Sequence, residues 1–354
     1  MINLNLDTYT LSSSLPSSFY INQVDASVTV HIIINNITIY STRLYPNGTI
    51  ATFYEFRSIV REYMRSHFLS IATVKVSADY GGGGETTNPK YIIFSDTKFS
   101  NDYDADFLVS NFLINRTYLT LPRNYGFALP FFHNGTDAVD PMACCKFETS
   151  NGKTFEYWVG LTAYTSNYPR VVMLSCGPEY VKRMADNEEG EDLGRLLSYT
   201  VYLGKRSMTF YVTDELPTME FEFLSAFNVW HTMYIYGTTN LKTDIDRKEA
   251  VISGSSTFYD QTVERLHEVQ TAPMTIEEAN WFNEFLESPY VWYNINEDVT
   301  DIRVLISDIK SEISDSSKDL IRMKFSWRHD DNTHYRDIDR IPQVFNKSYA
   351  PPFK

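Results

Sequence analysis

The chain has 354 residues, of which 45 are acidic and 31 basic, so its formal net charge is −14. Binding to nucleic-acid phosphates requires clustered Lys and Arg, so the excess of acidic residues argues against a sequence-specific nucleic-acid binder. It does not exclude a negatively lined pore through which DNA slides without adhering. Aromatic residues make up 15%, with 25 Tyr and 23 Phe, which favours a β-rich core or an excess of interface residues.

The N-terminal residues and the cysteines argue against a secreted, a membrane-inserted and a disulfide- or zinc-stabilised protein. Residues Met1 to Asp7 contain no basic segment and no long apolar run, so we expect no secretory signal and no membrane insertion. The three cysteines are odd in number and two are adjacent, which fits neither a disulfide framework nor a zinc site: Cys144, Cys145 and Cys176. We expect buried free thiols.

The first half begins with strand signals. Residues Val28 to Ile34 alternate apolar and polar side chains, and Ile37 to Tyr40 can pair with them across an Asn-Asn turn. A helix is predicted near 52–68, because Thr52 and Glu55 have the spacing of a capping box and apolar residues follow at helical spacing. Four consecutive glycines, 81–84, predict a mobile loop or a hairpin tip, since no Gly-Lys-Ser/Thr follows to make a phosphate loop.

Short strands are predicted over the rest of this half, because no segment shows a helical period. They are Tyr91 to Phe94, Phe107 to Ile114, Tyr118 to Leu121, Phe155 to Leu161 and Val171 to Leu174. The sharpest change of composition follows at Ala185 to Gly194, where five of ten residues are acidic. Such a run is typical of a solvated loop or linker.

The second half opens with a predicted hairpin, Leu197 to Leu203 and Ser207 to Val212 around a Gly-Lys-Arg turn. More strands are expected at Met219 to Phe223, Val229 to Tyr236, Ile252 to Val269, Tyr290 to Tyr293 and Ile302 to Ile306. A helix near 275–288 has a capping box at Thr275 and Glu278, and Pro289 ends it. Residues Ile321 to Arg328 alternate most cleanly and predict a strand with one buried face.

These elements predict a mainly β (α+β) chain of two β-barrel or β-sandwich domains, each flanked by one capped helix. The predicted limits are 1–184 for the first domain, 185–195 for an acidic linker or loop, 196–340 for the second domain and 341–354 for an extended tail.

Neither catalytic nor metal-binding motifs stand out, and we assign no catalytic, cofactor or metal residue. The chain has no Gly-x-Ser-x-Gly elbow and no His-Glu-x-x-His pair. His329 and His334 are five apart among acidic residues, which is more typical of a solvated tail than of a metal site. Asp102, Asp104 and Asp106 have the spacing that begins a calcium loop, but Phe107 stands where the loop needs Gly. We favour a polar loop there and leave a cation site open.

Two other functions compete with a structural role. A carbohydrate-binding or adhesin-like module would use exposed aromatic rings, with Trp158, Trp230 and Trp292 as candidates, although each is more typical of a core. A glycosidase would need two carboxylates at a fixed separation, and a sequence with 45 acidic residues does not identify such a pair.

The second half resembles a known group of proteins. The motifs are Phe227-Asn228-Val229-Trp230, the cap and helix Thr271 to Phe282, Leu286 to Val291, Lys310 to Asp315 and Met323 to Arg328, together with Leu44 to Thr49 in the first half. In these motifs, over about half of its length, the chain resembles tail-associated structural proteins of phages and prophages of Bacteroides-like gut bacteria, including the crAss-like group.

The resemblance implies a non-catalytic virion protein, made in the host cytoplasm, whose domains look like tail-tube modules. It implies a tail hub, ring or baseplate component that forms a cyclic homo-oligomer around the DNA channel and contacts other tail proteins during DNA ejection.

Overall fold

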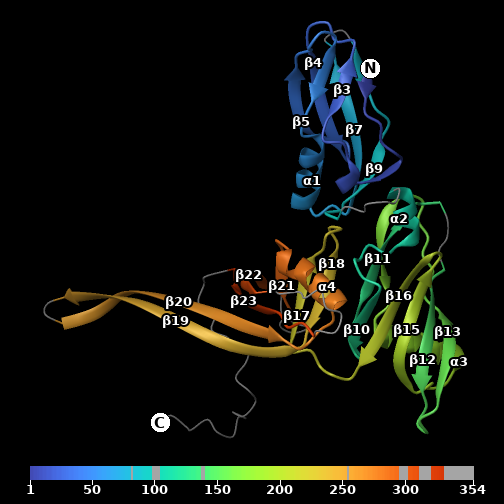
Figure 1. Cartoon of the computed structure of the whole chain (residues 1–354), viewed down its shortest axis with the longest axis vertical. Coiled ribbons are helices and arrows are strands. Elements are labelled where there is room, and N and C mark those ends of the chain that lie inside the picture. The colour runs from blue at the N-terminus through green and yellow to red at the C-terminus, as the bar shows by residue number, and fades with distance from the viewer. Residues whose placement is uncertain are drawn as a thin grey trace, which may run out of the picture.

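A computed structural model describes residues 1–80, 83–97, 104–136, 140–252, 255–294, 302–310 and 320–330. The chain is mainly β with several sheets, as predicted (Figure 1). The described residues contain the α-helices α1 (Phe56–Ser66), α2 (Asp104–Ser110), α3 (Pro178–Glu189) and α4 (Ile276–Glu287). The predicted tail, 341–354, lies outside the described residues, as do Asp102 and His334.

The N-terminal unit packs two sheets and one helix. The smaller sheet has the order β1 (Ile2–Asn3), β3 (Phe19–Asn22), β6 (Ile50–Phe53). The larger has the order β2 (Tyr9–Leu11), β9 (Lys90–Ile93), β7 (Ile71–Asp79), β4 (Val28–Ile34), β5 (Ile37–Leu44), with β8 (Gly84–Thr86) pairing β7. A short 3₁₀ turn, η1, spans Ser12–Ser14. The β7–β8 pairing places a hairpin at the glycine run, of which residues 81–82 are outside the described part.

The alternation of buried and partly exposed side chains along β4 explains how the core of this unit forms. Val28, Val30, Ile32 and Ile34 are buried, and they share one hydrophobic cluster with the inward face of α1. The predicted capping box of this helix is wrong. Thr52 belongs to β6 and pairs with Tyr20, and the residue that precedes α1, Glu55, has φ 66° and makes no side-chain cap.

The rest of the chain, from α2 onward, is here called the second body. It begins with a sandwich, the middle sandwich, in which one sheet faces a two-stranded sheet and helix α3. The larger sheet has the order β10 (Tyr118–Pro122), β16 (Arg206–Thr213), β15 (Arg195–Leu203), β12 (Met142–Glu148), β13 (Thr154–Gly160). The smaller pairs β11 (Ala128–His133) with β14 (Arg170–Ser175). The predicted hairpin around residue 204 is confirmed as β15–β16. The strand predicted at 107–114 is wrong, because residues 104–110 form α2, and a short apolar run does not separate strand from helix.

The C-terminal part adds a sheet covered by α4. Its order is β18 (Trp230–Ile235), β17 (Met219–Leu224), β21 (Val291–Tyr293), β22 (Ile302–Lys310), β23 (Lys324–His329), β20 (Ser255–Thr271), β19 (Gly237–Ile252). Helix α4 has the predicted capping box, in which the Thr275 side chain accepts from the Glu278 amide and the Glu278 side chain accepts from the Thr275 amide. A strand is confirmed at β23, but its predicted alternation holds only in part, because Ser326 is buried along with Phe325 and Trp327.

The predicted domain boundary at 185–195 requires correction. Residues 185–189 belong to α3, and strand β12, which precedes the acidic run, pairs with β15, which follows it. One hydrophobic cluster extends from Phe112 to Trp327, whereas the N-terminal unit has a separate core that ends at Phe94. The break between these two cores therefore falls between residues 94 and 112, and a third, smaller cluster that includes Ile93, Phe107 and Phe227 joins the two bodies there. Asp186, Glu188 and Glu189 of the acidic run lie on α3, whereas Glu191 and Asp192 lie in the short loop that follows it.

Two of the three cysteines behave as expected. Cys145 and Cys176 are buried free thiols, whereas Cys144 is half-buried. Burial raises the pKa of Cys145 to about 12 and also raises that of Cys176, so neither is a thiolate at neutral pH.

His231 in β18 makes stability depend on pH. It is buried among Phe127, Phe223 and Trp281, and burial lowers its pKa from 6.5 to about 4. Between those values the unfolded chain binds a proton that the folded chain does not, so stability is full above pH 6.5 and falls as pH drops toward 4. We expect a loss of about 3 kcal/mol over this interval, at about 1.4 kcal/mol per pH unit. Urea unfolding at a series of pH values measures it, and His231→Phe should flatten the curve; an equally steep curve in the variant would assign the loss to other groups.

Candidate interaction surfaces

The residues singled out for cation binding serve other purposes where they are described. The Asp104 carboxylate accepts hydrogen bonds from the Leu11 amide and the Ser14 hydroxyl, both at 2.8 Å, so it ties α2 to the N-terminal unit. His329 lies beside Trp327, with ring centroids 5.5 Å apart. Among the described residues, no group of three or more His, Cys, Asp or Glu is placed to hold a metal ion.

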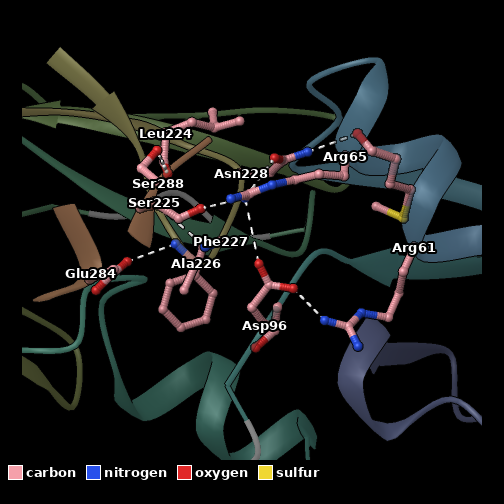
Figure 2. Close-up of polar contacts among 12 residues, drawn as sticks. Arg61, Arg65, Asp96, Leu224, Ser225, Ala226, Phe227, Asn228, Glu284 and Ser288 are labelled. Atoms are coloured by element: carbon pink, nitrogen blue, oxygen red, sulfur yellow. Dashed lines mark hydrogen bonds and ion pairs between the residues drawn. The ribbon is translucent and has the colours of Figure 1, made fainter. Parts of the chain in front are cut away.

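The two bodies meet at a polar junction formed by the loop 225–229, between β17 and β18 (Figure 2). The Asn228 side-chain amide donates to the backbone oxygens of Met64 and Leu69, at 2.8 and 3.1 Å. Asn228 itself has φ 57°, a conformation that Asn tolerates better than most residues. The Asp96 amide donates to the Ala226 oxygen at 2.8 Å. The loop therefore binds the end of α1 and the segment after β9 through polar contacts, and its Phe227 and Val229 side chains pack in a hydrophobic cluster that includes residues of both bodies.

Charged side chains surround this loop. Arg65 donates to the Ser225 oxygen at 2.8 Å and to the Asn228 side chain at 3.2 Å, and Asp96 pairs with both Arg61 and Arg65 (Figure 2). Burial lowers the pKa of Arg65, although Asp96 opposes this. Glu284 of α4 accepts from the Ala226 amide at 2.7 Å, and burial raises the pKa of its carboxyl group. These contacts hold the N-terminal unit in a defined orientation on the second body.

Strands β19 and β20 form an arm that extends from the C-terminal sheet (Figure 1). The strands pair from Gly237–Thr271 to Ile252–Ser255, which at about 3.4 Å per residue gives a ribbon roughly 50 Å long. Only the base of the arm, from His267 to Gln270, pairs with β23. A two-stranded ribbon alone is marginally stable in water, and beyond its base the arm pairs with no further strand among the described residues, so we expect a partner to cover it.

One face of the arm, here called the apolar face, carries Leu241, Ile245 and Val263, with the polar pair Thr243–Arg265 between them. Leu241 and Ile245 are 53% and 45% exposed, and Ile245 lies opposite Val263 on the neighbouring strand. On the other face Asp244 lies opposite Glu264, a placement of like charges that destabilises an isolated ribbon. Arg328 is 3.3 Å from Glu264 and relieves part of this repulsion.

The outer face of the β10–β16–β15–β12–β13 sheet carries exposed aromatic side chains. Trp158 is 51% exposed and stacks on Tyr202, with ring centroids 5.5 Å apart at an angle of 27°. Met142 and Tyr211 are also exposed on this face. The expectation that Trp158 belongs to the core is therefore wrong. Trp230 and Trp292 are half-buried, and Trp230 contacts Phe68 near the junction.

Comparisons with known proteins place the chain in no family. No protein-family model matches it, and no curated protein matches it. Two solved structures of the plexin A4 full extracellular region are weakly similar, with TM-scores of 0.19 and 8% identity. The matches cover 90% of this chain and 35% and 30% of the plexin chains, so this chain corresponds to about a third of their length. A likeness of this size supports no conclusion about fold or function.

Membrane-spanning helices were also sought. Within the described ranges, no helix combines the length and the apolar character needed to cross a bilayer.

Proposed function

We propose that the chain is a structural protein of a phage tail, and that it assembles into a homo-oligomeric ring around the DNA channel and contacts neighbouring tail proteins. The observation that supports assembly most strongly is the arm formed by β19 and β20, because Leu241 and Ile245 are exposed on a two-stranded ribbon that extends away from the C-terminal sheet (Figure 1). The assignment to a phage tail rests on the sequence resemblance described above.

A second copy of the chain is a suitable partner for the arm. The arm extends away from strands β12 and β13, which lie on the other side of the molecule, so the arm of one copy is free to reach that sheet in the next (Figure 1). Contacts between two different surfaces of the same chain generate a closed ring when the rotation between copies closes. Such a ring also covers exposed strand edges, which are otherwise sites of uncontrolled pairing.

The net charge agrees with a channel. A chain with a net charge of −14 contributes a negative field in a ring, which keeps DNA from adhering to the wall of the lumen.

The test is the oligomeric state of the purified chain. We expect closed rings of uniform diameter in negative-stain images, and a concentration-dependent sedimentation coefficient above that of a monomer. A chain that sediments as a monomer up to its solubility limit, and that forms no ring with the neighbouring tail proteins, would contradict the proposal.

A carbohydrate-binding or adhesin-like module is the second candidate function. The stacked pair Trp158–Tyr202 favours it, because exposed aromatic faces stack on sugar rings. This function predicts glycan binding that is lost in Trp158→Ala and that does not depend on oligomer formation.

A further inference from the structure

A cavity of about 220 Å³ lies between the middle sandwich and the C-terminal sheet, at the base of the arm. Its wall combines Arg116, which lies between α2 and β10, with Tyr236, which follows β18, and Trp281 of α4. Thr271, at the end of β20, also lines it. These residues are far apart in the sequence and meet only because the sheets share one core.

Hydrogen-bond donors are concentrated in this wall. The Nε and Nη2 groups of Arg116, the Tyr236 hydroxyl and the Trp281 Nε1 group are all buried, and none has a hydrogen-bond partner among the described residues. Trp281 as a whole is only 6% exposed. Burial and Glu215 raise the pKa of Tyr236, so its hydroxyl keeps its proton at neutral pH. Buried donors in native proteins are almost always paired, so four in one cavity indicate a ligand that offers acceptors.

Acidic groups in the same wall restrict the charge of that ligand. Glu215 and Glu278 both line the cavity, so an anion would meet two carboxylates. A cation would meet the guanidinium of Arg116, which already lies 5.2 Å from the centre of the Trp281 ring. Leu119, Met233 and Phe282 supply apolar surface. The wall thus offers donors, acceptors and apolar contact to one small neutral molecule.

We propose that this cavity binds a neutral, hydroxyl-rich ring of the size of a single sugar residue. Its oxygens accept hydrogen bonds from Arg116, Tyr236 and Trp281, and its hydroxyl groups donate to Glu215 and Glu278. This site is separate from the Trp158–Tyr202 pair and does not depend on ring assembly.

The test uses the full chain and two probe classes. Methyl glycosides of glucose, galactose, mannose and N-acetylglucosamine are added singly to protein labelled with 5-fluorotryptophan, and inorganic phosphate serves as the anionic probe. We expect at least one glycoside to shift the ¹⁹F resonance of Trp281 and to leave that of Trp158 in place. Phosphate should shift neither.

Conservative variants then test the donors. Trp281→Phe and Tyr236→Phe each remove one donor and keep an aromatic ring, and each should weaken glycoside binding at least about threefold, measured by saturation-transfer NMR. Trp158→Phe is the matched control and should leave the affinity unchanged. The proposal is overturned if no glycoside in the panel moves the Trp281 resonance, if phosphate moves it, or if binding depends on Trp158 instead.

Discussion

A chain in which residues 242–266 are replaced by an Asn-Gly turn is expected to fold and to remain monomeric at concentrations where the full-length chain forms rings. Leu241 and His267 are directly paired, so a two-residue turn can join them without altering the base of the sheet. None of the described side chains of the deleted segment belongs to the hydrophobic core, so the unfolding temperature should change little. Because the arm is proposed to supply one side of each subunit contact, we expect association to weaken by a factor of about a hundred or more. Sedimentation equilibrium measures the association constant.

Two single substitutions on neighbouring residues separate the faces of the arm. Ile245→Asp places a charge on the apolar face and should prevent ring formation, whereas Asp246→Asn changes the opposite face and should leave rings intact. Assembly that survives the arm deletion would assign the subunit contact to another surface. Equal effects of the two point variants would show that the apolar face is not the part that docks.

Elements could be predicted from the sequence where the local residue pattern agrees with the way the element packs in the folded chain. The capping box at Thr275 and the burial of Phe325 and Trp327 on one face of β23 each have a local physical cause, and both occur as predicted. The Thr52–Glu55 pair has the same spacing but forms no capping box, because strand pairing with Tyr20 holds Thr52 in β6 and α1 begins only at Phe56. The helix predicted near 52–68 is nevertheless present, so the spacing of its apolar residues was the more reliable signal.

The misplaced boundary has a similar cause. Helix α3 buries only a narrow face, with Pro178, Val181 and Ala185, and its acidic side chains outnumber these. The amino-acid composition at the end of α3 therefore resembles that of a linker, although the helix lies against β13 and contributes to one continuous core. Residues 241–249 of the arm have the opposite property: they form a strand in which neither face is buried, so the alternation that marks half-buried strands is weak.

The cavity at the base of the arm could not have been predicted from the sequence. Arg116, Tyr236 and Trp281 belong to segments more than 40 residues apart, and each alone is an ordinary residue for its element. Only the packing of α4 and β18 on the middle sandwich brings their donors to one space. Sequence patterns report which face of an element is buried, and not which polar atoms are left without partners there.

Replacing Arg206 with Met is expected to cost about 3 kcal/mol or more of the free energy of unfolding. Arg206 begins β16 and is only 7% exposed. Its Nε group donates to the Asn111 oxygen at 3.0 Å, and its Nη2 group donates to the oxygens of Leu108 and Phe132. Burial lowers its pKa to about 10, so it is charged at neutral pH. Methionine fills similar space but leaves three carbonyl groups without their donor, and each buried orphan costs about 1–3 kcal/mol.

The adjacent residue provides the matched control for this substitution. Lys205 is exposed in the turn between β15 and β16, so Lys205→Met removes a positive charge one position away and should change stability by less than about 0.5 kcal/mol. Arg206→Lys should recover only part of the loss, because one ammonium group cannot reach carbonyls on α2, the loop after it and β11 together. Urea unfolding of the three variants measures these differences. Equal losses in Arg206→Met and Lys205→Met would show that charge in the turn, and not the buried guanidinium, joins α2 to the sheets of the second body.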